Sequence, residues 1–206
     1  MDSLIDTIKN RRSIRKYTQD PIAPEIIKEL LDLAVWAPSA HNAQPWRFII
    51  ITDPVQKQVF AQAMARVWFA DLKKDGVPPG AQTVMAKISV DRFVSAPVLI
   101  IACLTMEDML RFPDIERQRC ERDLAVQSLS AAIQNLLLAA HAKGLGSCWY
   151  CSPIFCKPIV QEILKIPLNV EPQALITLGY PAETGNTPLR VPVQRIAYLG
   201  KWGSAL

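Results

Sequence analysis

A cluster of basic and hydroxyl side chains lies close to the N-terminus, in the run Arg11-Arg12-Ser13-Ile14-Arg15-Lys16. Guanidinium groups bind phosphate oxygens through paired hydrogen bonds, and the hydroxyl of Ser13 adds a further donor. The segment therefore suits a phosphate monoester. A solvated basic patch or a nonspecific nucleic-acid contact has the same composition, and a short basic run on its own favours that simpler interpretation.

A second polar cluster is the loop from Trp36 to Trp46, which contains His41, Asn42 and Gln44. Asn and Gln side chains each offer hydrogen-bond donors and acceptors, so the loop suits the edge of a flat heterocycle. An ordinary loop whose side chains bond their own backbone is the alternative. For His41 we expect a structural or solvated role, because the sequence shows no second catalytic partner for it.

The third cluster, Gly144 to Pro153, contains Cys148 and Cys151 at CxxC spacing. This spacing occurs in redox pairs and in zinc sites. A zinc site needs more ligands than two cysteines, and the chain has only two histidines and no second CxxC. A thioredoxin-like pair follows a strand and opens a helix, whereas this one lies where a helix passes into a strand. We therefore expect buried thiols and no metal.

Hydrophobic spacing predicts the elements that position these clusters. Predicted helices are an opening turn into Asn10, a stripe from Pro24 to Val35 that Pro38 ends, a third helix after Asp53-Pro54, a long central helix from Arg117 to Lys143, and a helix from Pro153 to Leu164. Predicted strands are Trp46 to Ile51, Pro97 to Leu104, Leu145 to Tyr150 and Ala174 to Tyr180. The third helix loses its pattern at Lys73 to Gly80, which we interpret as a linker. The order indicates an α/β or α+β fold.

Length and composition limit the classes of protein. The 206 residues favour one domain over residues 1–206, and 50% apolar with 20% charged residues excludes a disordered chain. A net charge of +4 is small for a nucleic-acid-binding protein. The longest apolar stretches fall short of the roughly 20 residues that cross a membrane, and the N-terminus lacks the features of a signal peptide. We expect a cytoplasmic protein with reduced cysteines that binds neither nucleic acid nor membranes.

Taken together, the clusters resemble in order and spacing the FMN-dependent nitroreductase family. The residues that carry the resemblance span nearly the whole chain: Arg11–Arg15, Ala37–Trp46, Gly144–Gly146, Leu178–Glu183 and Arg190. A narrower similarity is to the C-terminal flavin domain of the bifunctional ligase that glutamylates the deazaflavin coenzyme F-420. It rests on Arg111–Asp114, Gly144–Trp149, Ile154-Phe155 and Glu171-Pro172. In that family the flavin domain is associated with reduction of a dehydro precursor of the coenzyme.

The resemblance implies a flavin site and an oligomeric fold. Arg11, Arg12, Ser13 and Arg190 would hold the FMN phosphate. Arg15 would stabilise negative charge on the pyrimidine side of the reduced ring, acting electrostatically, and no dedicated catalytic side chain is required. Ser39, Asn42 and Gln44 would contact the isoalloxazine, with Ala40 where relatives often have a hydroxyl, and the Cys151-Ser152 backbone would approach flavin N5. The family fold is an α+β sheet flanked by helices, built as an intertwined homodimer with two interface sites to which both chains contribute.

The activity that the resemblance implies is a ping-pong cycle from NADH, NADPH or another donor, through FMN, to a small organic acceptor. That acceptor is a dehydro precursor of coenzyme F-420 or, alternatively, a nitroaromatic or a quinone. The region Val77–Gly80 falls where the family often covers the substrate side. A flavin-binding module without efficient turnover and a nucleic-acid-binding protein are the other hypotheses.

Overall fold

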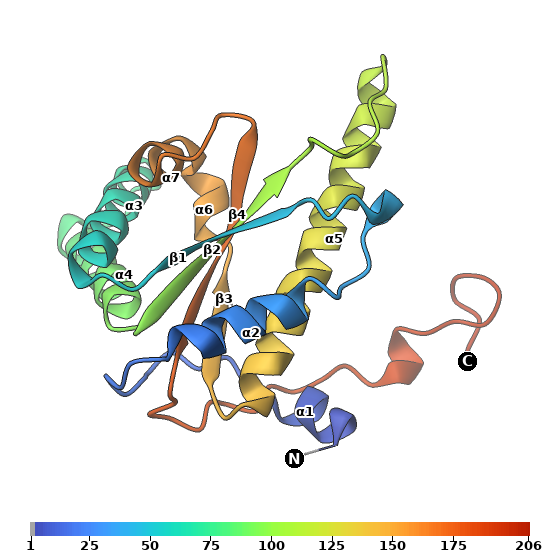
Figure 1. The fold of residues 1–206 in the computed structure, drawn as a ribbon, viewed down its shortest axis with the longest axis horizontal. Coiled ribbons are helices and arrows are strands. Elements are labelled where there is room, and N and C mark those ends of the chain that lie inside the picture. The colour runs from blue at the N-terminus through green and yellow to red at the C-terminus, as the bar shows by residue number, and fades with distance from the viewer. Residues whose placement is uncertain (1–2) are drawn as a thin grey trace.

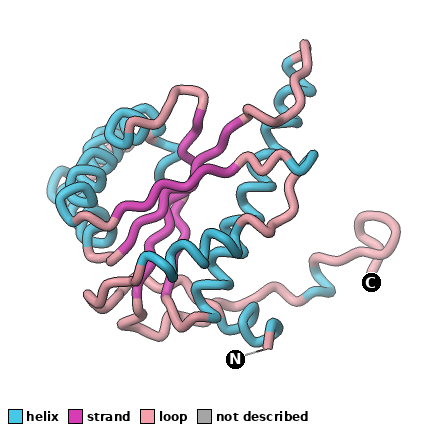
Figure 2. The backbone as a smooth tube through the Cα atoms, viewed as in Figure 1, coloured by secondary structure: helices cyan, strands magenta, loops and turns pink. Residues whose placement is uncertain are grey.

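The computed structural model describes residues 3–206, which form an antiparallel sheet of strand order β1-β2-β4-β3 with helices on both faces (Figures 1 and 2). The strands are β1 (Trp46–Ile51), β2 (Val98–Thr105), β3 (Gly146–Tyr150) and β4 (Val170–Gly179). The α-helices are α1 (Leu4–Asn10), α2 (Pro24–Ala34), α3 (Pro54–Lys74), α4 (Pro79–Val94), α5 (Ile115–Ala142), α6 (Ser152–Phe155) and α7 (Lys157–Leu164). Short 3-10 helices are η1 (Ala40–Asn42) and η2 (Val193–Arg195). The expected α+β architecture is confirmed.

Strand β2 lies inside the sheet and divides the protein into two cores. It pairs with β1 and β4, and all eight of its side chains are buried. Because successive side chains of a strand point to opposite faces, Ile100 and Leu104 pack with α2 and α5, whereas Leu99 and Ile101 pack with α3, α4 and α7. A strand that is covered on both faces reads as a continuous apolar run, which is why the sequence predicted it.

Helix α5 is the long element of the first core. Its N-terminus is capped by Asp114, whose side chain accepts a hydrogen bond from Arg117 N at 2.9 Å, so the helix begins two residues before the predicted start. It ends where Gly144 adopts a positive φ of 76° and Leu145 N bonds back to Ala140 O. The sequence prediction of a long central helix is confirmed.

Helix α4 is an element that the sequence analysis missed. The predicted linker Lys73–Gly80 shrinks to a tight turn that contains Gly76 at φ 73°, and Pro79 begins a second helix that packs along α3. Because the α3–α4 hairpin packs on the sheet along one side only, α4 keeps apolar side chains such as Val84 and Ile88 exposed. Its sequence therefore lacks a clean amphipathic period.

The predicted helix Pro153–Leu164 is also wrong in part, because the structure breaks it at Cys156 into α6 and α7. Pro158 has no N–H group to continue the backbone hydrogen bonds of α6, so it lies in the first turn of a new helix. Strand β4 begins at Val170, four residues before its predicted start.

A half-buried ion cluster ties β4 to the helices. Glu171 accepts from Arg122 Nη2 at 2.8 Å and from Lys157 Nζ at 2.5 Å, which joins β4 to α5 and α7. The hydrogen bond from Arg122, followed by that from Lys157, lowers the pKa of Glu171 to about 2 against the effect of its burial.

The chain ends in an arm, residues 188–206, that leaves the body of the protein (Figure 1). Most of its apolar side chains are exposed, with Leu189 fully so and Trp202 88% exposed. No helix among residues 3–206 combines the length and the apolar character needed to cross a bilayer.

Candidate functional site

The N-terminal segment Arg11–Lys16 is fixed against the edge strand β3. Ser13 forms a parallel bridge with Ser147, and Ile14 N donates to Ser147 O at 3.0 Å. Gly146 allows this approach, because a Cβ at that position would lie 2.8 Å from Ile14 Cγ2. The backbone geometry of the basic segment therefore depends on a glycine 130 residues away in sequence.

The chain that follows β4 holds the same segment from its other side. Glu183 Oε1 accepts from the backbone N–H groups of Arg15 at 2.6 Å and Lys16 at 3.2 Å. Gly185, at φ 71°, lies so close to Arg12 that a Cβ there would meet the Arg12 Cβ at 2.8 Å. The carboxylate of Glu183 thus fixes the main chain and leaves the guanidinium of Arg15 without an ion pair among residues 3–206.

Three guanidinium groups gather at this place. Burial, then the positive charge of Arg190, then that of Arg12, lower the pKa of Arg11. None of the three takes part in an ion pair within the described chain. Like charges that repel one another without a carboxylate between them favour a bound anion. Arg12 Nη1 is partly committed to the carbonyl oxygens of Lys9 at 2.6 Å and Arg11 at 2.9 Å.

One cavity adjoins the basic segment, and a second cavity shares Ile88 and Arg92 of α4 with it. The first, of about 670 Å³, is polar and is lined by Ser13, Arg15 and the chain around Glu183. The second, of about 690 Å³, is mainly apolar and lies between the α3–α4 hairpin and the end of β3 with α6. Its walls include aromatic and sulfur-containing side chains: Met64, Trp68, Met85, Phe93, Tyr150, Cys151, Phe155 and Cys156. Volumes of this size are typical of small-molecule sites.

Arg92 is a functional candidate that sequence reasoning missed, because the helix that carries it was not predicted. Its Cζ lies 5.8 Å from the ring centroid of Tyr150, and that ring packs edge-on against Phe93 at 5.2 Å. The side chain is half-buried and makes no ion pair in the part of the chain that the structure describes. A cation held on an aromatic face where two cavities meet offers a second positive charge near Arg15.

The cysteines differ in exposure. Burial raises the pKa of Cys103 to about 12 and that of Cys156 to about 11, so both remain thiols near neutral pH. Cys148 is buried, but Cys151 is exposed and lines the apolar cavity with Ser152, so the expectation of a buried thiol is wrong for Cys151. In residues 3–206, no disulfide forms and no group of three or more His, Cys, Asp or Glu side chains is arranged to hold a metal.

The loop that carries Ser39, Asn42 and Gln44 lies elsewhere in the subunit. Ala40 N donates to Ser128 Oγ at 3.1 Å, in the middle of α5, whereas the basic segment lies beside β3, just past the C-terminal end of α5. The fourteen residues from position 128 to the end of the helix span about 20 Å. Within one subunit this loop therefore does not join the cation cluster.

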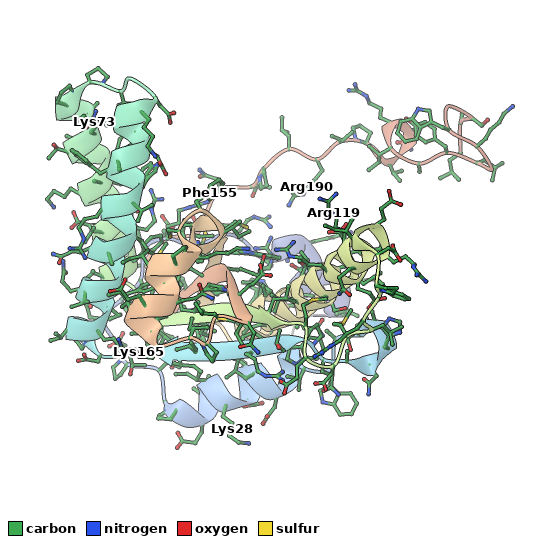
Figure 3. The ribbon with its side chains drawn as sticks, turned by 90° about the horizontal axis from the view of Figure 1, so that it is seen from above. Lys28, Lys73, Arg119, Phe155, Lys165 and Arg190 are labelled. Atoms are coloured by element: carbon green, nitrogen blue, oxygen red, sulfur yellow. The ribbon has the colours of Figure 1, made fainter. Side chains whose placement is uncertain are left out.

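The structure thus divides the expected flavin residues into two groups. It brings together Arg11, Arg12, Ser13, Arg15 and Arg190, with Cys151 and Ser152 across the shared wall of the two cavities. It places Ser39, Asn42 and Gln44 in a separate group beside the middle of α5. Figure 3 shows the position of Arg190 at the start of the arm and of Phe155 beside the α3–α4 hairpin.

Comparisons with known proteins bear on this arrangement. Residues 8–180 match the Nitroreductase family. An NADH dehydrogenase of Thermus thermophilus is 30% identical, with 90% of each chain covered. A Methanothermobacter thermautotrophicus protein described as an NADH dehydrogenase/NAD(P)H nitroreductase is 33% identical, with 97% of this chain and 87% of its own length covered.

Solved structures have the same architecture. A Desulfovibrio desulfuricans protein described as a nitroreductase, in complex with FMN, has a TM-score of 0.75 at 27% identity, with 98% of this chain and 99% of its own chain covered. A BluB-like flavoprotein from Clostridium difficile has a TM-score of 0.81 at 24% identity, with 98% and 100% covered, and this second likeness concerns the fold.

Proposed function

The chain belongs to the nitroreductase family, and we propose how this FMN-dependent oxidoreductase holds its cofactor and receives its substrates. The observation that carries the proposal is the cluster of Arg11, Arg12 and Arg190, which has no carboxylate partner among the described residues. Burial first, and then the charges of Arg190 and Arg12, lower the pKa of Arg11. A phosphate monoester carries nearly two negative charges and fits such a cluster. The residues present therefore fit FMN.

The phosphate would bind to Arg11 and Arg190, with the hydroxyl of Ser13 as a third donor and Arg12 as a weaker contact. Arg12 contributes less because its guanidinium already donates to two carbonyl oxygens at the end of α1. The bridge between Ser13 and Ser147 fixes the backbone that carries this hydroxyl relative to β3. Pre-positioned donors lose little freedom when the anion binds.

The polar cavity would receive the cofactor beyond its phosphate. Bound FMN supplies the redox chemistry, because its ring accepts electrons from a nicotinamide and returns them to an acceptor. Arg15 and Arg92 line this cavity and supply fixed positive charge, which stabilises negative charge that appears beside them. The Cys151-Ser152 backbone, at the start of α6, forms the wall of the adjoining cavity and would face the reactive edge of the ring.

A second copy of the chain would complete each site. Ser39, Asn42 and Gln44 lie about 20 Å along α5 from the cation cluster of their own subunit, so another subunit is needed to bring them to a flavin. The exposed apolar side chains of α1 and of the arm provide a surface for this contact: Leu4, Ile5, Ile8, Leu189, Val191, Ile196, Leu199 and Trp202. Large exposed apolar surfaces of this kind mark protein interfaces. We therefore propose a homodimer.

The apolar cavity would bind the acceptor. Trp68, Phe93, Tyr150 and Phe155 give it aromatic walls, which suit a flat aromatic molecule. Burial raises the pKa of Tyr150, so its phenol remains protonated and can donate a hydrogen bond. Both a dehydro precursor of coenzyme F-420 and a nitroaromatic or quinone fit this description, and the local motif similarity favours the precursor. We place the enzyme in the cytoplasm, where its free cysteines stay reduced.

Steady-state oxidation of NADH and NADPH by the FMN-loaded protein tests the function. We expect oxidation that depends on an acceptor, and a comparison of the dehydro precursor with a nitroaromatic and a quinone separates the two acceptor classes. No reaction with the precursor would remove the first class. Bound FMN with no oxidation of either nicotinamide by any acceptor would favour a flavin-binding module instead.

A further inference from the structure

The loop Ser39–Gln44 has a strained backbone. Three of its residues other than glycine adopt positive φ: His41 at 57°, Asn42 at 51° and Gln44 at 46°. This left-handed region is sterically unfavourable for residues with a Cβ, although Asn tolerates it better than most. Such a conformation persists only where the surroundings impose it, and it is found mostly at functional sites.

Three contacts impose it here. Ser39 Oγ accepts from Gln44 N at 3.1 Å and closes the loop on itself. Ala40 N donates to Ser128 Oγ of α5 at 3.1 Å. His41 Nε2 lies 3.3 Å from Oε1 of Glu121, also on α5. The side chains of Asn42 and Gln44 stay exposed and make no hydrogen bond within residues 3–206, so they remain available to a ligand.

Glu121 is unusual among the acidic residues of the chain because its side chain is only 6% exposed. A buried carboxylate is unfavourable unless hydrogen bonds compensate its lost hydration. Its second oxygen, Oε2, accepts from Leu110 N at 3.2 Å. No lysine or arginine pairs with it in the described chain. One carboxylate therefore connects α5, the strained loop and the segment that precedes α5.

We propose that Glu121 is a positioning residue: through His41 it holds the loop Ser39–Gln44 in its strained conformation, so that Asn42 and Gln44 are presented to the flavin ring bound by a second copy of the chain. The inference rests on the proposed function for its ligand, but the geometry of the loop is independent of it. Glu121 itself touches neither cofactor nor substrate in this arrangement.

Hydrogen exchange of the flavin-free protein tests the loop directly. The amides of residues 40, 42, 43 and 44 are hydrogen-bonded in the structure and should exchange slowly. Glu121→Met removes both acceptor oxygens, and we expect these amides to exchange at least tenfold faster. Glu121→Gln keeps an acceptor for the Leu110 amide and a group that pairs with the imidazole, so it should restore slow exchange.

His41→Asn removes the contact between the loop and Glu121 but leaves the carboxylate of Glu121 in place. Asn tolerates the left-handed backbone but is too short to reach Glu121, so the loop amides should exchange faster while the Leu110 amide stays protected. Glu116→Met, at an exposed position on the same helix, is the matched control and should leave the exchange of the loop amides and of the Leu110 amide unchanged. Loop exchange within twofold of the natural protein in both Glu121→Met and His41→Asn would overturn the proposal.

Flavin binding gives the second measurement. Since the loop would face the ring and not the phosphate, Glu121→Met and His41→Asn should weaken FMN and riboflavin equally, each by at least tenfold, and change the visible circular dichroism of bound FMN. Unchanged affinity for both flavins would overturn the inference. If the natural protein binds neither flavin, the proposed function fails, whereas the exchange experiment still decides whether Glu121 holds the loop.

Discussion

Replacing Arg11 with Gln should weaken FMN binding while it leaves riboflavin binding intact. Riboflavin lacks the phosphate, so the ratio of the two affinities isolates the contact that the cation cluster is proposed to make. Arg11 is half-buried, and burial and two neighbouring guanidinium groups lower its pKa, so without an anion it is held at an energetic cost. Arg11→Gln removes that repulsion and the anion contact together.

The size of the effect follows from the type of hydrogen bond. A hydrogen bond to a charged group contributes about 1.5–3 kcal/mol. Loss of this amount raises the dissociation constant for FMN about 10- to 150-fold. The flavin-free variant should melt no lower than the natural protein, because one of three repelling charges is gone. Arg190→Gln should behave in the same way.

Titration of flavin fluorescence in phosphate-free buffer measures both affinities, and thermal denaturation of the flavin-free protein gives the stability. Arg66→Gln, an exposed arginine of α3 outside both cavities, is the control and should change neither affinity. An equal loss of FMN and riboflavin affinity would mean that Arg11 supports the fold or the ring site. Unchanged FMN affinity would refute the placement of the phosphate.

Three further predictions concern packing, pH and assembly. Gly146→Ala should lower the free energy of unfolding by about 1–3 kcal/mol because its Cβ would overlap the N-terminal segment. Gly80→Ala in α4, where nothing lies within 4 Å of the added Cβ, should raise it by up to about 1 kcal/mol. Equal urea denaturation curves for the two variants would contradict this packing. The hydrogen bond from Arg122 helps lower the pKa of Glu171 from 4.5 to about 2, so the stability that this carboxylate adds is complete above pH 4.5 and is lost as pH falls toward 2. Glu171→Gln should make the melting temperature less dependent on pH over that range. A melting temperature that falls between pH 4.5 and 2 as steeply as in the natural protein would argue against the cluster. Co-expression of Arg11→Gln with Asn42→Ala should restore one intact site per mixed dimer, and FMN affinity no better than that of either variant alone would argue against sites shared between subunits.

The sequence predicted elements well where their apolar residues are buried in the core. Strand β2 is buried on both faces and helix α5 buries one stripe, so the continuous apolar run of β2 and the helical apolar spacing of α5 predicted their bounds to within one or two residues. Helix α4 was missed because it packs mainly on α3 and leaves apolar residues such as Ile88 exposed. The break at Cys156 was missed although Pro158 marks it, since the apolar spacing continues across the break.

The site was predictable in part. The basic segment could be identified from residue types, but the approach of Arg190 to Arg11, across most of the chain, depended on a family resemblance and not on any local pattern. The strained backbone around His41 and the buried partner of its ring have no sequence signal, because left-handed φ values at residues other than glycine follow from tertiary contacts. Arg92 was inaccessible to sequence reasoning for the same reason that α4 was.

The most direct test of the central claim is the visible spectrum of the purified protein, loaded with FMN and kept free of oxygen, before and after addition of NADH or NADPH. An FMN-dependent oxidoreductase should show the bands of bound flavin, and at least one nicotinamide should bleach them. Failure to retain FMN after reconstitution, or bound flavin that only dithionite bleaches, would contradict the account.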